Sequence, residues 1–278
     1  MFNFIIGQIM KPTLSIIGAG KAGRVLAHQF VRHHVFTVQD VMNRSLQSSQ
    51  SACEFIGAGT PVGEPGALRT ADIFLIAVPD DQIKATSLLL QEQHLIEPST
   101  IVFHCSGALG SDQLGMQRGA ASVHPMRSFA DPAQVAANFA GTICTLEGDP
   151  YANRVLQHAL HQIEANVLCI KLESKTLYHA AAVFASNYLV TLMDAALQTL
   201  VAAGIRSDMA MKMVAPLATE SLDNVLRLGP RAALTGPIAR GDQNTVLRHE
   251  EALNNWDGNM AVLYHELARA TVSMKQRS

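Results

Sequence analysis

The sequence has little charge, and charge of one sign accumulates nowhere along it. Charged residues make up 16% of the 278 residues, and the formal net charge is −2. Proteins that bind nucleic acid or an anionic membrane surface need a basic patch, which this chain lacks. We therefore expect neither a nucleic-acid partner nor a membrane partner.

Cysteine is also scarce, and the four cysteines stand far apart in the sequence. Cys53, Cys105, Cys144 and Cys169 match no metal-ligand spacing, so we propose no metal site. All but Cys53 lie in or beside apolar runs. This placement is typical of buried, reduced thiols in a cytoplasmic protein.

Long uninterrupted apolar runs are missing as well. The first ten residues are apolar, but they are too few to span a membrane and have no basic leader or small-residue cleavage site. We interpret residues 1–10 as an N-terminal extension, with Met1 or Met10 as the true start. The longest apolar helical stretch, 177–201, is interrupted by Asn187, Asp194 and Gln198.

A glycine turn follows the first predicted strand, at residues 14–23. It has the pattern G-x-G-x-x-G between a strand and a helix, which is the context of a dinucleotide site. Gly18 permits the tight turn, Gly20 lets the backbone approach a pyrophosphate, and Gly23 lets the helix lie close on the strand. A turn that only packs the strand against the helix is the alternative. The predicted cofactor-binding residues here are Gly18, Ala19, Gly20, Lys21, Ala22 and Gly23.

The end of the second predicted strand, 38–42, bears on which dinucleotide binds. An acidic residue about 20 positions after the glycines accepts the ribose hydroxyl of NAD, but Asp40 lies within the strand. Arg44 stands at the strand end between Asn43 and Ser45, where a guanidinium can bind the 2′-phosphate of NADP. The sequence therefore favours NADP, with a solvated surface arginine as the alternative.

Strands and helices alternate through residues 1–172. Further strands are expected at 72–78, 100–103, 121–123, 141–146 and 167–170. This alternation is typical of an α/β fold with a doubly wound, mostly parallel Rossmann sheet. We predict that residues 1–172 form the dinucleotide-binding domain.

The pattern changes after residue 172. Residues 174–203 contain no Gly or Pro, and apolar side chains surround much of the expected helix, which is typical of a buried helix. More helices are expected at 207–228, 242–254 and 257–274. We predict that residues 173–278 form an all-α domain for substrate binding and dimerisation, because so small a bundle cannot enclose the long helix alone.

Polar groups follow three predicted strands at the edge of the sheet where ligands bind. The groups after two of these strands are expected to contact substrate and to catalyse. The groups after the remaining strand, Val78, Pro79 and Asp80, are expected to contact the cofactor. Ser106 and His124 are the candidate catalytic residues among them; a loop hydrogen bond and a rigid His-Pro turn are the alternatives. The sets are His104, Ser106 and Gly107; His124; and Val78, Pro79 and Asp80.

A second polar cluster opens the long helix. Lys175 and His179 are four residues apart and share a helix face. Such a pair can polarise a carbonyl or imine and deliver a proton, so both are candidate catalytic residues; a solvated first-turn lysine is the alternative. Asn187 needs a partner for its amide, either substrate or a neighbouring helix. Arg240 lies in a Gly/Pro turn at residues 234–242, where it would hold an acidic substrate or close over the cofactor. A turn that only joins two helices is the alternative.

Together these motifs resemble a known family. The chain is similar to Rossmann-like proteins with a helical C-terminal domain of unknown function, and more broadly to pyrroline-5-carboxylate reductase and other reductases of the 6-phosphogluconate dehydrogenase type. The resemblance implies an NADP-dependent oxidoreductase that is dimeric through its helical domain. It supplies no substrate, because the Ser-Pro-Gly-Gly-Thr-Thr turn of pyrroline-5-carboxylate reductases is absent and His179 stands where the wider group often has asparagine. The motifs that carry it are 17–23, 43–45, 77–80, 104–108, 124–126, 178–187, 235–237 and 240–242.

The sequence therefore predicts a cytoplasmic, homodimeric oxidoreductase. It would move hydride between NADP(H) and a small carbonyl, imine or hydroxy-acid substrate in a cleft between two domains. The alternative is a nucleotide-binding sensor or scaffold protein that kept the fold and lost the chemistry. Polar residues at several strand ends favour the enzyme.

Overall fold

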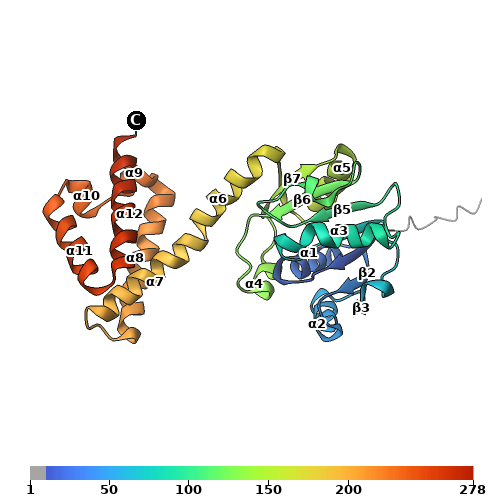
Figure 1. Cartoon of the computed structure of the whole chain (residues 1–278), viewed down its shortest axis with the longest axis horizontal. Helices are drawn as coiled ribbons and strands as arrows, with labels where there is room; N and C mark the ends of the chain where they lie inside the picture. The colour runs from blue at the N-terminus through green and yellow to red at the C-terminus, as the bar shows by residue number, and fades with distance from the viewer. Residues whose placement is uncertain (1–10, 278) are drawn as a thin grey trace, which may run out of the picture. The chain divides into compact units, whose positions relative to one another are not determined.

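The computed structural model describes residues 11–277, so the N-terminal extension expected at residues 1–10 lies outside the described residues. The chain divides into two compact units that meet after Val183. The first unit holds a sheet flanked by helices, and the second holds helices only (Figure 1). Residues 173–183, which we expected to open the second domain, thus pack with the sheet unit, and the functional boundary at residue 172 stays a prediction.

The first unit is built on eight strands in the order β3-β2-β1-β4-β5-β6-β7-β8. All neighbouring pairs are parallel except β6 and β7, which confirms the predicted doubly wound, mostly parallel fold. The chain winds from β1 to β2 on one side and returns to β4 on the other. The crevice between β1 and β4 is therefore the switch point at which such sheets bind ligands. The strands are β1 (Thr13–Ile17), β2 (Thr37–Met42), β3 (Thr60–Val62), β4 (Ile73–Ile76), β5 (Ile101–His104), β6 (Ala120–Pro125), β7 (Ile143–Gly148) and β8 (Asn166–Cys169).

Helices cover both faces of this sheet. Side chains from α1, α2, α4 and α5 share one hydrophobic cluster with the strands, and α3 belongs to a second cluster on the other face. In β4, Ile73 and Leu75 join the first cluster while Phe74 and Ile76 join the second, which explains its continuous apolar run. The helices are α1 (Lys21–Arg32), α2 (Leu46–Ile56), α3 (Ile83–Glu92), α4 (Pro132–Ala137) and α5 (Pro150–Gln162), with short 3₁₀ turns at Pro65–Ala67, Asp80–Gln82, Ser111–Leu114 and Leu172–Ser174.

The unbroken helix predicted over 174–203 is wrong at one point. Helix α6 (Lys175–Ala185) ends before Ser186, whose backbone leaves the helical region with φ −123° and ψ −69°. Helix α7 (Asn187–Ala202) then begins, and the carbonyl of Ser186 accepts its first helical hydrogen bond from Val190 N. Serine and asparagine are weak helix formers that favour helix starts, which accounts for a break at this pair.

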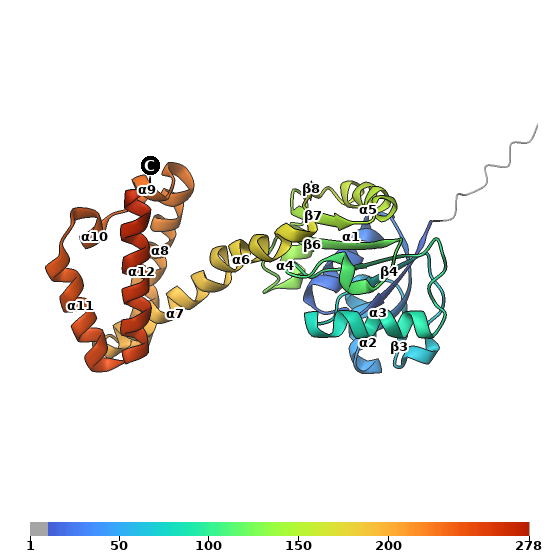
Figure 2. The ribbon, with the colours of Figure 1, turned by 45° about the horizontal axis from the view of Figure 1, so that its top comes forward.

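The second unit contains two helix pairs. Helix α7 packs against α8, and α11 packs against α12 (Figure 2). In the described part of this unit, Ala210, Val214 and Ala268 are the only buried hydrophobic residues. The unit therefore has little core of its own. Its other helices are α8 (Ser207–Leu228), α9 (Pro230–Ala233), α10 (Gly236–Arg240), α11 (Gln243–Trp256) and α12 (Gly258–Gln276).

Candidate functional site

The glycine turn after β1 packs directly against the end of β4. Gly18 has φ +83°, and a Cβ atom on it would lie 2.6 Å from Val78 Cγ1 and 2.8 Å from the Ala77 carbonyl carbon. A Cβ on Gly23 would lie 2.7 Å from Ala77 Cβ. Any side chain at either position would push the turn and α1 away from β4. The structure thus has the tight turn expected at Gly18 and the close helix packing expected at Gly23, while their cofactor contacts stay predictions.

Gly20 differs from the other two glycines because it faces open space. No heavy atom of the described chain lies within 4 Å of a Cβ built on Gly20. It borders a pocket of about 610 Å³ at the switch point between β1 and β4. The pocket is lined by Ile17, Gly18, Ala19, Gly20, Arg24, Met42, Asn43, Arg44, Ser48, Gly63, Pro65, Ala77, Val78, Pro79, Gln82 and Thr86.

Two basic residues line this pocket. Arg44 is exposed, and it makes no hydrogen bond or ion pair with the described part of the chain. Arg24 was missed by the sequence analysis, although it directly follows the glycine pattern on the first turn of α1. Its Nε donates to the carbonyls of Ala19 and Gly20 at 3.3 Å, and its guanidinium lies 5.7 Å from the Phe55 ring centroid. The pocket can therefore offer two cations to an anionic ligand.

Asp40, the acidic residue near the position typical of NAD binding, is not in this pocket. Its side chain is 1% exposed and forms an ion pair with Arg69, whose Nη2 lies 2.5 Å from Oδ1. The backbone N–H of Arg69 also donates to Asp40 Oδ2 at 2.9 Å. The Asp40 carboxylate is thus already paired with Arg69, and Arg44 is the charged residue at the end of β2 that lines the pocket.

The remaining predicted cofactor residues lie around the pocket without lining it. Lys21 Nζ donates to the carbonyl of Ala130 at 3.1 Å, and Ala22 lies on the first turn of α1. Ser45 caps α2, because its hydroxyl accepts from the N–H of Ser48. Asp80 accepts a hydrogen bond from Ser106 Oγ at 2.8 Å, which joins the end of β4 to the loop after β5.

His104 is fully buried and has no nitrogen left for a ligand. Its Nδ1 accepts from the N–H of Ser106 at 3.1 Å, so its Nε2 carries the proton that is donated to the carbonyl of Gly110 at 2.9 Å. Burial lowers the pKa of His104, which keeps the ring neutral. Both ring nitrogens thus hold the loop, and the substrate contact expected of His104 stays a prediction.

Ser106 is also saturated by internal hydrogen bonds. Besides donating to Asp80, its hydroxyl accepts from the N–H groups of Ala108 at 3.2 Å and Leu109 at 3.0 Å. Its carbonyl accepts from Lys175 Nζ at 3.1 Å. Ser106 thus holds the loop to its neighbours, and the catalytic and substrate roles expected of its hydroxyl stay predictions.

Lys175 is buried, which excludes the solvated lysine that the sequence left open. Its side chain is 1% exposed, and Nζ lies 2.7 Å from Ser122 Oγ in addition to its bond to the Ser106 carbonyl. Burial lowers the pKa of Lys175, and Glu147 and Asp80 oppose that shift. The ammonium group points inward and donates to the Ser106 carbonyl and Ser122 Oγ, and its catalytic role stays a prediction.

Three further polar side chains, those of His124, Tyr178 and His179, gather beside this loop. Tyr178 OH lies 2.8 Å from His124 Nδ1, and the His124 and His179 rings meet edge to face with centroids 5.7 Å apart. Both rings pack onto Gly107: a Cβ there would lie 2.9 Å from His124 Nε2 and closer still to His179 Nδ1. His179 Nδ1 is buried and has no hydrogen-bond partner among the described residues. These groups can hold or move a proton at the ligand-binding edge.

The other two predicted substrate residues lie in the second unit. Asn187 is exposed at the start of α7, and Arg240 is the exposed last residue of α10. Asp242 caps α11 as expected, with its Oδ1 accepting from Thr245 N at 3.1 Å. The substrate roles of Asn187 and Arg240 stay predictions. Across residues 11–277, no group of three or more His, Cys, Asp or Glu side chains is placed to hold a metal ion.

Two family comparisons match separate parts of the sequence. Residues 6–124 match the Rossmann-like domain, and residues 142–271 match DUF2520, a domain of unknown function. A comparison with proteins of curated function finds no match. The resemblance predicted from the motifs, a Rossmann-like domain followed by a helical domain of unknown function, is therefore confirmed.

Solved structures are similar along nearly the whole chain. Protein TM1727 from Thermotoga maritima is 25% identical, with a TM-score of 0.71 over 95% of this chain and 100% of that chain. A proposed NADP oxidoreductase, BF3122 from Bacteroides fragilis, is 22% identical, with a TM-score of 0.78 over 96% and 100%. A pyrroline carboxylate reductase from Plasmodium falciparum with NADP bound is 13% identical, with a TM-score of 0.58 over 96% and 100%. The last two share the fold with this chain.

Proposed function

Because this chain combines a Rossmann-like domain with a DUF2520 domain, we propose that it is an NADP(H)-dependent oxidoreductase. It would move hydride to or from a small carbonyl, imine or hydroxy-acid substrate. The observation that carries the proposal is the pocket at the switch point, where Gly20 leaves space for phosphates and Arg44 lies on the wall. The structural neighbours include reductases and a structure with NADP bound, which supports the same cofactor class.

The residues of the pocket fit NADP(H) by their chemistry. The backbone of Gly18–Gly20 and the N-terminus of α1 would hold the pyrophosphate. Arg44 would pair with the 2′-phosphate, since Asp40 is already bound to Arg69. The nicotinamide would supply or accept the hydride. Val78 and Pro79 line the same pocket and lead to Asp80, which is bonded to the loop that carries Gly107.

Replacing Arg44 by alanine is expected to weaken NADPH binding by about 1.5–3 kcal/mol, the scale of a hydrogen bond to a charged group. NADH binding should hardly change, because NADH has no 2′-phosphate. Fluorescence titration of the purified protein with each nucleotide measures both affinities. Arg154→Ala, at an exposed arginine of α5 outside the pocket, is the matched control and should bind both nucleotides like the wild type.

An equal loss of affinity for both nucleotides would contradict the 2′-phosphate contact of Arg44. If the wild type binds neither nucleotide, the oxidoreductase proposal fails. If the wild type binds NADPH, a screen of carbonyls and imines by NADPH oxidation tests turnover. NADPH binding without oxidation of any compound would favour the alternative sensor or scaffold protein.

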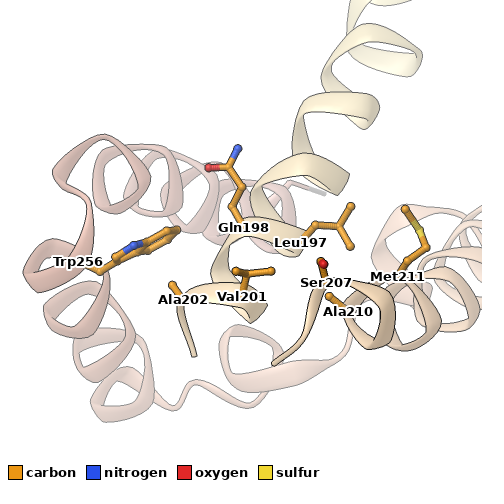
Figure 3. A pocket seen from close by; sticks show the side chains of 8 residues that line it. All are labelled: Leu197, Gln198, Val201, Ala202, Ser207, Ala210, Met211 and Trp256. Carbon is orange, nitrogen blue, oxygen red and sulfur yellow. The ribbon is translucent and has the colours of Figure 1, made fainter. Parts of the chain in front are cut away.

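We also propose that the protein is a homodimer through its second unit. Large apolar side chains are exposed on several of its helices, including Phe184 (70%), Val190 (69%) and Leu226 (76%). An apolar pocket of about 410 Å³ has Trp256 and Met211 among its lining residues, and none of its lining side chains is charged. Figure 3 shows these side chains. An exposed apolar surface of this extent is typical of an association site, and a second copy would bury the same face on both chains.

The segment Leu172–Ala202 is also long and apolar enough to cross a membrane, and none of its most apolar window is buried. The break at Ser186 and the hydrogen-bonded pair Asp194 and Gln198 favour a protein partner over lipid. We therefore keep the proposal of a cytoplasmic protein with no membrane or nucleic-acid partner.

Light scattering of the wild type should give about twice the chain mass of 29.9 kDa. Val190→Glu should shift the protein toward the monomer, because the dimer would bury an unpaired carboxylate. Leu88→Glu is the matched control, since Leu88 is an exposed apolar residue (44%) on α3 of the sheet unit. A monomeric wild type, or one recovered only with lipid vesicles, would overturn the dimer proposal.

A further inference from the structure

The Tyr178 hydroxyl and the His124 ring form a pair at the ligand-binding edge of the sheet. Tyr178 OH lies 2.8 Å from His124 Nδ1, and the two rings meet edge to face with centroids 5.6 Å apart. His124 lies near the end of β6, whereas Tyr178 lies one turn into α6. The pairing therefore joins two segments that are 54 residues apart in the sequence.

The ring of His124 is neutral at physiological pH. Burial is the largest cause that lowers the pKa of His124 to about 4, and the nearby His179 and Lys175 lower it further, while Asp80 opposes them. A neutral imidazole carries one N–H, either on Nδ1 or on Nε2. What the ring can offer a substrate thus depends on its tautomer.

The direction of the hydrogen bond to Tyr178 decides that tautomer. Burial raises the pKa of Tyr178, so its hydroxyl keeps its proton. Two groups face that hydroxyl: His124 Nδ1 at 2.8 Å, and Thr145, whose side-chain hydrogen bond lowers the Tyr178 pKa and is therefore one that Thr145 donates. The Tyr178 proton is then left for His124 Nδ1. If Tyr178 donates to Nδ1, the imidazole proton must lie on Nε2. That nitrogen lies on the side of Gly107, beside the unpartnered Nδ1 of His179.

We propose that Tyr178 is a positioning residue that holds His124 as the Nε2–H tautomer, so that Nε2 donates a hydrogen bond to the carbonyl or imine group of the substrate. Polarising that group would favour the arrival of hydride at its carbon. Lys175 and Ser106 fix the loop that carries Gly107, against which the His124 ring packs. The substrate part rests on the proposed function, whereas the tautomer does not.

Long-range ¹H–¹⁵N correlation spectra of the full chain, labelled with ¹⁵N-histidine, test the tautomer directly. His124→Gln identifies the His124 signals by their loss. In the wild type we expect a bare Nδ1 and a protonated Nε2 that stay unchanged from about pH 8 to about pH 5.5. In Tyr178→Phe, the two nitrogens should shift toward the average of both tautomers, because nothing then holds the proton on Nε2.

The second unit offers a matched control. His249 and Tyr264 form a pair with nearly the same geometry, 2.9 Å between the hydroxyl and Nδ1 and ring centroids 5.7 Å apart. Tyr264→Phe should therefore leave the His124 signals unchanged. A wild type with the proton on Nδ1 of His124 would overturn the proposal even if Tyr178→Phe failed to fold. Identical His124 signals in the wild type and in folded Tyr178→Phe would overturn it too.

An NADPH titration separates this proposal from the proposed function. Tyr178 does not line the nucleotide pocket, so Tyr178→Phe should bind NADPH like the wild type. A wild type that binds no NADPH would refute the proposed oxidoreductase function. The tautomer of His124 would still be decided by the ¹H–¹⁵N spectra alone.

Discussion

Replacing Gly20 by valine is expected to abolish NADPH binding and to leave the fold in place. No heavy atom of the described chain lies within 4 Å of a Cβ at this position, and the backbone angles, φ −68° and ψ −161°, suit any residue. The branched side chain would project into the pocket and occupy the space that the phosphates need. Gly18 and Gly23 are less suitable for this test, because a side chain at either would collide with the end of β4.

The readout combines an NADPH fluorescence titration with a thermal unfolding curve. Valine is a poor residue at a helix N-cap, so a loss of stability of up to about 1 kcal/mol is expected. Gly66→Val is the control, since Gly66 also faces open space but does not line the pocket. It should bind NADPH normally. Normal binding by Gly20→Val would show that the phosphates lie elsewhere, and the cofactor site would have to be moved.

The regular parts of the fold were predictable because their signals are local. The apolar run of β4 is a buried strand with a face on each cluster, and its residues are all apolar for that reason. In the second unit, Asp242 and Asp257 accept hydrogen bonds from the first N–H groups of α11 and α12, and both residues marked the helix starts in the sequence.

Short elements escaped prediction because they span too few residues to show a period. Strand β3 lies in the Gly/Pro stretch 57–66, and its residues pair with β2 through the backbone. Helices α9 and α10 each carry a proline in the first turn, and α10 lies in the stretch that the sequence analysis took for a turn between two helices. The break at Ser186 escaped prediction because residues 174–203 contain no Gly or Pro, and a serine followed by an asparagine weakens a helix without excluding it.

For the site, the sequence indicated which residues would gather but not where their side chains would point. Strand ends placed Asp80, Ser106 and His124 at one edge, and the structure has them there. The inward direction of Lys175 depends on two acceptors, the Ser106 carbonyl and Ser122 Oγ, which are distant in sequence. Tyr178 belongs to the polar cluster that opens the long helix in the sequence, but its pairing with His124 depends on a tertiary contact.

Acidification is expected to destabilise the wild type more than the His124→Gln variant. The pKa of His124 is lowered to about 4 in the folded protein, chiefly by burial, whereas an unfolded histidine titrates near 6.5. Below pH 6.5 the unfolded chain therefore binds a proton that the folded chain refuses, and the free energy of unfolding falls until about pH 4. The difference corresponds to about 3 kcal/mol for this one residue.

Glutamine does not titrate, so His124→Gln should lose about 3 kcal/mol less stability across this pH range. Urea unfolding curves at several pH values between about 7 and about 4 give the unfolding free energy of each protein as a function of pH. The difference between the two pH dependences removes the contribution of groups common to both proteins. The lowered pKa of buried His104 acts with the same sign in both proteins, so it cancels in that difference. His158→Gln, at an exposed histidine of α5, should keep the wild-type slope. An equal pH dependence of the unfolding free energy in the wild type and His124→Gln would mean that His124 has its ordinary pKa of about 6.5 in the folded protein, and the lowering of that pKa by burial would be excluded.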